Sequence, residues 1–422
     1  MSPLRLADRA ARPSPSKLRE SIQAEIGSER TPRDLGLCRF RPSPSVNEGL
    51  IENRRRLRPR GLIKRSAAMP NLQDRPADAD WLRALQTPPA QLPADADKLD
   101  ADSLLRDDQH RPIVDRDAWL ARRATIRARW LEFLGEIPKP AVAPKIQVLE
   151  EDRPENVVRQ LIRYEAELGL PIEGYLLFPQ GDPPQGGWPA AVVMHSTQDY
   201  TIRQPAGLEG KPEMFLGLEL AKRGYVAMCP RCYLWQYGKP GRGIIEAVDW
   251  LRKRHPQVKG MAKMLFDAIR AVDLLVARSD VNARKIAAIG HSLGSKEALY
   301  LAAFDERVQA AVASEGGVGI SYSNWEAPWY LSDAAKRPGF GRTHAEIVAL
   351  AAPRALLLIG GDSADGDKSW PYVAAGKPVW SLLGRPEAVG LLNHKAGHAL
   401  PAPAREIAFR WISRFLDHPA TP

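Results

Sequence analysis

The sequence predicts an α/β fold built on a mostly parallel, doubly wound sheet with helices on both faces. Two observations carry this prediction. From about residue 189 to the C-terminal region, short apolar runs alternate with longer segments of helical periodicity, which is the pattern of β-α-β units. The run Pro189–Met194 is apolar at every residue, as expected for a parallel strand that is buried on both faces.

One helix and three strands are expected before this run. Between Asp115 and Gly135, tryptophan and aliphatic residues recur at helical spacing with arginines between them, which predicts an amphipathic helix. Three short, partly alternating runs follow at Lys145–Leu149, Val157–Tyr164 and Ile172–Phe178. Because such runs are typical of antiparallel strands, we expect them at one edge of the sheet.

The remaining elements alternate along the chain. We expect strands at Tyr225–Met228, Lys285–Ile289, Val308–Ala313, Arg354–Ile359 and Val389–Leu392. We expect helices at about 212–223, 261–278, 293–303, 371–383 and 402–416. The stretch 231–260 has a less regular pattern, and it contains Trp235, Tyr237 and Trp250.

The positive charge of the chain is concentrated near its N-terminus. The whole sequence has a formal net charge of +10, and residues 1–70 alone hold 16 basic against 7 acidic residues, a net of +9. Residues 1–68 are rich in Arg, Pro and Ser, so we expect a disordered basic segment there. Residues 69–112 are predicted to be an extended lead-in, and 113–422 the folded domain.

Composition argues against several classes of protein. The basic segment has no interleaved aromatic residues and no known nucleic-acid module, so we expect no nucleic-acid partner. The pair Cys229 and Cys232, with Cys38 as the third cysteine, provides neither a disulfide framework nor a complete zinc site. No run of 18 apolar residues and no secretory signal is visible. We therefore expect a cytoplasmic protein that binds no membrane.

A G-x-S-x-G motif, Gly290-His-Ser-Leu-Gly294, makes Ser292 the candidate nucleophile. The motif directly follows the strand Lys285–Ile289 and opens the helix at 293–303, which is the context of a nucleophile elbow. A serine on such a turn presents its hydroxyl above the sheet, beside the N–H groups of the helix N-terminus. The alternative is a surface turn in which Ser292 only caps the helix.

A serine nucleophile needs a general base, and with this type of elbow the order along the chain is Ser, acid, His. His398 follows the last predicted strand and precedes the last helix, with a glycine before it, so it is the favoured base. His394 on the same loop is the runner-up. His344 precedes the candidate acids and His418 lies beyond the last helix.

Three aspartates compete for the acid that orients the base. They follow the penultimate predicted strand, Arg354–Ile359, in Gly-Gly-Asp362-Ser-Ala-Asp365-Gly-Asp367. Asp365 is preferred, Asp367 is the runner-up and Asp362 comes third. Those that do not orient the histidine are expected to cap the following helix.

The oxyanion hole is expected to combine backbone N–H groups from two segments. One is the N–H of Leu293, the residue after the nucleophile. The other is the N–H of Ser196 or Thr197, on the loop that follows Pro189–Met194. His195 in the same loop is equally well explained as a core or loop histidine.

These motifs make residues 115–417 resemble the dienelactone hydrolase-like, acetyl-esterase-like branch of the α/β-hydrolase superfamily. The stretches that carry the resemblance are Met194–Gln198, Ala206–Gly210, Leu220–Tyr225, Gly290–Gly294, Ala303–Arg307, Gly360–Asp365 and Gly397-His398. The resemblance implies the α/β-hydrolase fold, a triad of Ser292, Asp365 and His398, and no metal or organic cofactor. The chain departs from dienelactone hydrolases proper, which use a cysteine nucleophile.

The predicted function is that of a serine carboxylic-ester hydrolase acting through an acyl-enzyme. The resemblance implies a small-molecule ester with a short acyl group, often an acetyl group on a carbohydrate. Two alternatives stay open: a peptidase or amidase with the same triad, and a non-catalytic binding protein of the same fold. The aromatic residues of 231–260 and of Ser321–Leu331 are expected either to wall the pocket or to belong to the core.

Overall fold

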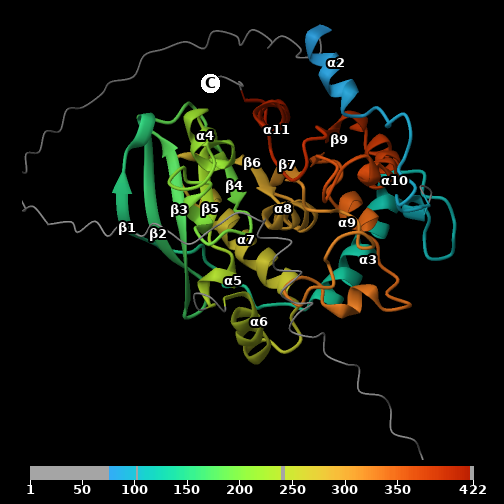
Figure 1. The fold of residues 1–422 in the computed structure, drawn as a ribbon, viewed down its shortest axis with the longest axis horizontal. Coiled ribbons are helices and arrows are strands. Elements are labelled where there is room, and N and C mark those ends of the chain that lie inside the picture. The colour runs from blue at the N-terminus through green and yellow to red at the C-terminus, as the bar shows by residue number, and fades with distance from the viewer. Residues whose placement is uncertain (1–75, 101–102, 239–242, 419–422) are drawn as a thin grey trace, which may run out of the picture. The chain divides into compact units, whose positions relative to one another are not determined.

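A nine-stranded mixed sheet runs through the described residues, which are 76–100, 103–238 and 243–418 in this computed structural model (Figure 1). The segment 1–68, for which we predict disorder, lies outside them. The strand order is β1-β2-β3-β5-β4-β6-β7-β8-β9. The strands are β1 (Ile146–Asp152), β2 (Val157–Glu167), β3 (Leu170–Pro179), β4 (Trp188–Met194), β5 (Val226–Pro230), β6 (Val281–His291), β7 (Val308–Ser314), β8 (Ala355–Gly360) and β9 (Val389–Asn393).

The sheet is antiparallel at one edge and parallel elsewhere. β1, β2, β3 and β5 pair antiparallel in that order, whereas β5, β4, β6, β7, β8 and β9 are parallel. All nine predicted strands are present within a few residues of their expected bounds, and the antiparallel edge lies where the alternating runs placed it. The predicted fold class is therefore confirmed.

Helices cover both faces of the sheet. Apart from the four-residue α5 (Tyr233–Gln236), the described α-helices are α2 (Pro76–Ala84), α3 (Arg116–Leu134), α4 (Leu216–Lys222), α6 (Gly243–Arg254), α7 (Gly260–Val276), α8 (Leu293–Phe304), α9 (His344–Leu350), α10 (Trp370–Leu382) and α11 (Ala402–Phe415). α7 and α8 pack on the central strands from one side, and α4 and α11 cover the other side (Figure 1). Every residue of β4 is buried as a result, in agreement with its continuous apolar sequence.

Several helices were not predicted from the periodicity of the sequence. The stretch 231–260 contains α5 (Tyr233–Gln236) and α6, and α9 begins at a capping box formed by Thr343 and Glu346. Single 3₁₀ turns lie at Ser103–Leu105, Pro154–Asn156, Thr201–Arg203, Pro212–Met214, Asp333–Lys336, Asp367–Ser369 and Pro386–Ala388. Among the described helices, none combines the length and the apolar character needed to cross a membrane.

The chain that follows α2 covers the outer edge of β9. The Leu391 N–H donates to the Leu85 carbonyl oxygen at 2.8 Å, and the Gln86 side chain donates to the Glu387 carbonyl oxygen at 2.8 Å. Leu85 itself is buried. Because an uncovered edge strand invites pairing with other chains, this segment protects the β9 side of the sheet.

α8 is buried along its whole length and carries Glu297 into the interior. Burial raises the pKa of Glu297 to about 8, although the Cys232 thiol donates a hydrogen bond to its carboxylate. The other carboxylate oxygen has no hydrogen-bond partner. The protonated form is therefore favoured in the folded protein at neutral pH.

Replacement of Glu297 by glutamine is expected to make stability less dependent on pH. Because the folded-state pKa lies above the unfolded one, the wild-type free energy of unfolding should fall as pH rises from about 4.5 to about 8. Glu297→Gln removes this titration, so it should be more stable than wild type by about 1–3 kcal/mol at pH 8 and similar at pH 4.5. Urea unfolding at both pH values tests this, with the exposed Glu132→Gln as control. The prediction is wrong if the difference in the free energy of unfolding between Glu297→Gln and wild type is the same at both pH values.

Candidate active site

The serine of the G-x-S-x-G motif lies on a sharp turn between β6 and α8. Ser292 has φ 57° and ψ −117°, and a positive φ is uncommon for residues other than glycine. Its N–H donates to the Ser314 carbonyl oxygen on β7 at 2.8 Å. Its side chain makes no hydrogen bond that caps α8, so the helix-cap alternative does not describe this serine. The predicted strand–turn–helix arrangement is present.

The two glycines of the motif allow very close backbone contacts. A Cβ atom at Gly290 would lie 2.1 Å from the Gly294 carbonyl oxygen, and one at Gly294 would lie 2.5 Å from the Met194 carbonyl oxygen. Any larger residue would force the backbone apart. The second contact brings the N-terminus of α8 next to the end of β4, where the loop with Ser196 and Thr197 begins.

His398 is the histidine that contacts the serine. Its Nε2 lies 2.9 Å from Ser292 Oγ. Gly397 before it has φ 69°, a left-handed conformation that turns the loop after β9 back over the sheet. His394 does not contact Ser292: its backbone N–H donates to the Gly360 carbonyl oxygen, and its Nδ1 accepts from the Ala396 N–H. The structure thus places the favoured histidine, and not the runner-up, beside the serine.

The carboxylate that contacts His398 is Glu315, which the sequence analysis did not consider. Glu315 Oε2 lies 2.9 Å from His398 Nδ1. Glu315 directly follows β7, has φ 54°, and is buried. Its carboxylate also accepts from the backbone N–H groups of Gly361 and Ala364. Burial acts to raise the pKa of Glu315, but the hydrogen bonds from His398, Ala364 and Gly361 outweigh it and lower the pKa.

The prediction that Asp365 contacts the histidine is not met. Both carboxylate oxygens of Asp365 accept from backbone N–H groups, those of Gly317 at 2.7 Å and Val318 at 2.8 Å. The Ser369 hydroxyl donates to Asp365 as well, at 2.7 Å. Asp365 is buried and makes no hydrogen bond with His398, because both of its oxygens accept from the loop after β7.

The other two aspartates bond to Asn393 and not to His398. Asp362 and Asp367 both accept from the Asn393 side-chain amide, at 2.6 and 2.8 Å. Lys395 lies 3.7 Å from the carboxylate of Asp367. These contacts tie the loop after β8 to the loop after β9, so the runner-up Asp367 serves the same loop connection as Asp362.

The two segments predicted for the oxyanion hole lie side by side. Leu293 opens α8, and Gly294 after it packs against the backbone of Met194 and His195 at the end of β4. The Ser196 N–H donates to the Gln204 side-chain oxygen at 3.4 Å. The side-chain hydroxyl groups of Ser196 and Thr197 are buried and make no hydrogen bond.

His195 fixes this loop in place. Its Nε2 accepts from the Cys232 N–H at 3.1 Å, so its Nδ1 carries the proton and donates to the Ser196 carbonyl oxygen at 2.7 Å. Burial lowers the pKa of His195 to about 4. The imidazole is neutral at physiological pH and acts as a bridge between the loop after β4 and α5. The interpretation of His195 as a satisfied interior histidine fits these contacts.

A second buried histidine, His291, lies beside His398. The rings of His291 and His398 are 5.0 Å apart, and His291 Nδ1 lies 3.0 Å from the Ser314 hydroxyl. Burial, together with the neighbouring His398, lowers the pKa of His291 to about 3. His291 therefore stays neutral and adds no positive charge next to His398 when that ring takes up a proton.

Most of the aromatic residues expected as pocket walls belong to the core instead. Trp325, Trp329 and Tyr330 are completely buried, and the Trp325 Nε1–H donates to the Gly317 carbonyl oxygen at 2.7 Å. Trp235 is partly exposed and meets the His195 ring edge to face at 5.2 Å. Of the expected wall, the segment with Trp235 alone borders the predicted oxyanion loop through these contacts.

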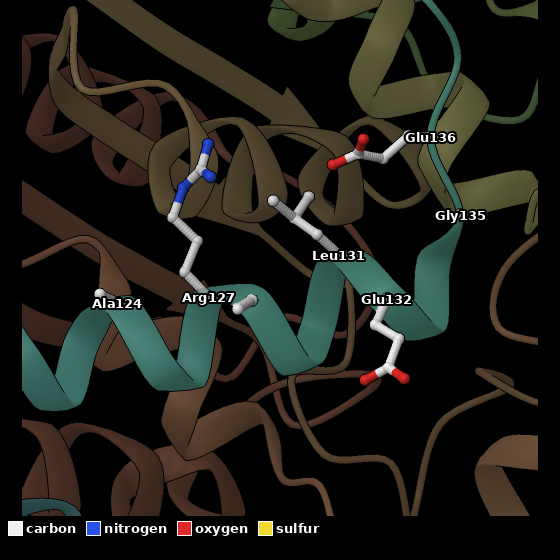
Figure 2. A pocket seen from close by; sticks show the side chains of 7 residues that line it. Ala124, Arg127, Leu131, Glu132, Gly135 and Glu136 are labelled. Carbon is white, nitrogen blue, oxygen red and sulfur yellow. The ribbon is translucent and has the colours of Figure 1, made fainter.

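A separate hollow lies on the surface along α3, and it contains none of the three residues of the serine–histidine–glutamate chain (Figure 2). It is lined by Ala124, Arg127, Ala128, Leu131, Glu132, Gly135 and Glu136. Among the described residues, no group of three or more His, Cys, Asp or Glu side chains could hold a metal ion. Cys229 and Cys232 are buried free cysteines at the end of β5 and the start of α5.

Comparison with known proteins bears on the family and the fold of the chain. Residues 172–338 match the model of the dienelactone hydrolase family, which confirms the predicted resemblance to that branch. "Putative hydrolase YtaP" of Bacillus subtilis (strain 168) is 26% identical over 324 residues, which cover 70% of this chain and all of that protein.

Solved structures show the same fold at low sequence identity. A glucuronoyl esterase from Solibacter usitatus superposes with a TM-score of 0.63 at 16% identity, covering 76% of this chain and 99% of that one. A protein described as a "putative acetyl xylan esterase" from Bacteroides fragilis NCTC 9343 superposes with a TM-score of 0.53 at 15% identity, covering 76% of this chain and 82% of that one. The α/β-hydrolase fold follows from these superpositions.

Proposed function

We propose that this chain, a carboxylic ester hydrolase with the α/β-hydrolase fold, cleaves short-acyl esters with a triad of Ser292, His398 and Glu315. The observation that carries the proposal is the continuous hydrogen-bonded chain from Ser292 Oγ through both ring nitrogens of His398 to Glu315, with both distances at 2.9 Å. A nucleophile, a base and a group that orients the base are the parts that serine acyl transfer requires.

The reaction takes place in two acyl-transfer steps. His398 Nε2 removes the proton from Ser292 Oγ as that oxygen attacks the ester carbonyl carbon. The tetrahedral intermediate collapses, the bond to the alcohol oxygen breaks, and His398 gives its proton to the leaving alcohol. Water then attacks the acyl-enzyme with His398 again as base, which releases the carboxylic acid and restores the Ser292 hydroxyl.

Backbone N–H groups stabilise the oxyanion of each tetrahedral intermediate. The Leu293 N–H at the start of α8 is one donor, and the loop after β4 supplies the other. Because the Ser196 N–H already donates to Gln204, the Thr197 N–H is the favoured second donor. Loss of one such donor typically costs about 10²–10³-fold in kcat.

A sugar-linked ester is the favoured substrate class. The dienelactone hydrolase-like resemblance favours a small acyl group, and the structural neighbours include proteins named as acetyl xylan, glucuronoyl and methyl esterases. In the esters that these three names describe, either the acid or the alcohol is small or derived from a sugar. This support is at the level of the fold, so the acyl group is decided by experiment.

The proposed function is tested with p-nitrophenyl acetate, butyrate and octanoate, with acetylated xylan, with the methyl ester of glucuronic acid, and with acetyl p-nitroanilide. We expect kcat/KM on acetate to exceed that on octanoate by about tenfold or more. A fluorophosphonate should label Ser292, as mapped by mass spectrometry of its peptide. Cleavage of the anilide but not the esters would identify an amidase. Failure to cleave any substrate or to take up the label would favour the non-catalytic alternative.

A further inference from the structure

The loops after β7 and β8 exchange hydrogen bonds through two buried carboxylates. Glu315, on the loop after β7, accepts from the N–H groups of Gly361 and Ala364 on the loop after β8. Asp365, on the loop after β8, accepts in return from the N–H groups of Gly317 and Val318 on the loop after β7. β7 and β8 are neighbouring parallel strands, so each loop begins beside the other. We call this reciprocal arrangement of Glu315 and Asp365 the carboxylate clasp.

The turn that carries Glu315 needs support of this kind. Glu315 has φ 54°, and such a conformation costs a residue other than glycine about 1–3 kcal/mol and persists only where its surroundings hold it. Gly317, two residues later, also has a left-handed conformation with φ 72°. A small rotation of this turn would move the carboxylate away from His398 Nδ1.

Four buried side chains hold the backbone of the turn, and one of them is His344, whose Nδ1 donates to the Val318 carbonyl oxygen at 2.6 Å. Asp365 takes the N–H groups of residues 317 and 318. The Lys296 ammonium, one helical turn beyond Ser292 on α8, donates to the Gly316 carbonyl oxygen. The Trp325 Nε1–H donates to the Gly317 carbonyl oxygen. Asp365 makes two of these five hydrogen bonds and links the turn to the loop after β8.

The electrostatic environment of Asp365 indicates that this side chain does not serve folding stability alone. Burial raises the pKa of Asp365, and the charge of Glu315 nearby raises it further, while the hydrogen bonds from Val318, Ser369 and Gly317 oppose the increase. Two carboxylates so close together repel each other, which costs free energy. A neutral side chain would avoid that cost, but it could not accept from two backbone N–H groups with equal strength.

We propose that Asp365 is a positioning residue for Glu315. It lies on the loop after the penultimate strand, where the acid of the triad was expected, but both of its carboxylate oxygens accept from the backbone of the turn that carries Glu315. The inference rests on the proposed triad. Asp365 affects the rate of acyl transfer through Glu315 and not through contact with substrate.

Asp365→Asn tests the proposal in the full-length chain. The amide presents one donor toward a backbone N–H group, so one contact of the turn is lost. We expect kcat on p-nitrophenyl acetate to fall by about 10²-fold with KM changed less than about twofold, since misplacement of a catalytic group by about 1 Å costs that much. Asp362→Asn, an exposed aspartate on the same loop without a contact to the turn, is the matched control and should keep the wild-type kcat.

The double variant with Glu315→Gln separates positioning from a general effect on the fold. If Asp365 acts through Glu315, Asp365→Asn should lower kcat no further in the Glu315→Gln background. Ser369→Ala, which removes the hydroxyl donor of Asp365 and leaves both backbone contacts, should give a smaller loss that also vanishes in that background. If Asp365→Asn does not fold, Ser369→Ala tests in its place whether Asp365 acts through Glu315.

Two results would overturn the inference. One is a wild-type kcat in folded Asp365→Asn, and the other is an equal loss with and without Glu315→Gln. Both differ from failure of the proposed function, in which the wild type itself neither cleaves an ester nor takes up the fluorophosphonate label.

Discussion

Ser292→Ala is expected to lower kcat for p-nitrophenyl acetate by about 10⁶-fold, the size of loss typical for a serine that forms the acyl-enzyme. The hydroxyl is the atom that His398 contacts at 2.9 Å, and alanine leaves the imidazole without a nucleophile to activate. The strained turn itself remains, because it is fixed by the close contacts of Gly290 and Gly294. Rates are measured at saturating substrate against buffer alone, with the exposed Ser381→Ala as the matched serine control.

The serine and the histidine should behave as one unit. Because neither is useful without the other, Ser292→Ala combined with His398→Ala should be no slower than Ser292→Ala alone. A product of two separate losses would show that the two residues act in different steps. If Ser292→Ala keeps the wild-type rate, another nucleophile performs the reaction and the triad assignment is wrong.

Local sequence patterns were sufficient for the fold and for two of the three residues of the candidate site. Pro189–Met194 predicts a central strand because every residue is apolar, and β4 is buried at each of these positions. Ser292 is recognisable because strand, glycines and helix follow one another without a break between residues 285 and 303. His398 is recognisable by its place after the last strand. Each of these arguments uses only neighbours along the chain.

The acid could not be found in this way, because its identity depends on which strands are neighbours. β7 and β8 lie side by side, so a carboxylate directly after either strand reaches the same region of the sheet edge. Three aspartates follow β8 and a single glutamate follows β7, and the sequence alone does not show which of these carboxylates reaches the histidine. A glutamate between Ser314 and two glycines, directly after a buried strand, was the one available signal.

The short helices were missed for a related reason. α5 has four residues and α9 has seven, which is too short for a repeating apolar face to be recognised. α9 does begin with a capping box, Thr343 and Glu346, and that pattern can be read from a sequence. The aromatic residues near it could not be divided into wall and core, since apolar character is the same in both.

Glu315→Gln is expected to lower kcat by about 10⁴-fold, which exceeds the loss expected for any variant of the three aspartates after β8. Glutamine has nearly the same shape, and its one oxygen can still accept from the Gly361 N–H, which donates to Oε1, whereas Ala364 and His398 both contact Oε2. Its amide nitrogen then faces His398 Nδ1, where a donor opposes a donor and favours the wrong tautomer of the imidazole. Ser292 Oγ would then face a protonated Nε2 that cannot take its proton.

The order of kcat among the carboxylate variants shows whether Glu315 or Asp365 is the acid that orients the histidine. The expected order of kcat is Asp367→Asn near wild type, Asp365→Asn lower, and Glu315→Gln lowest, with the half-exposed Glu326→Gln as the control for the exchange. Unfolding midpoints measured on the same samples show whether each variant is folded. If Asp365→Asn falls below Glu315→Gln while both remain folded, the acid follows β8 and the contact between Glu315 and His398 is structural. If Glu315→Gln is lowest and fluorophosphonate labelling of Ser292 slows in parallel, the carboxylate after β7 orients the catalytic histidine.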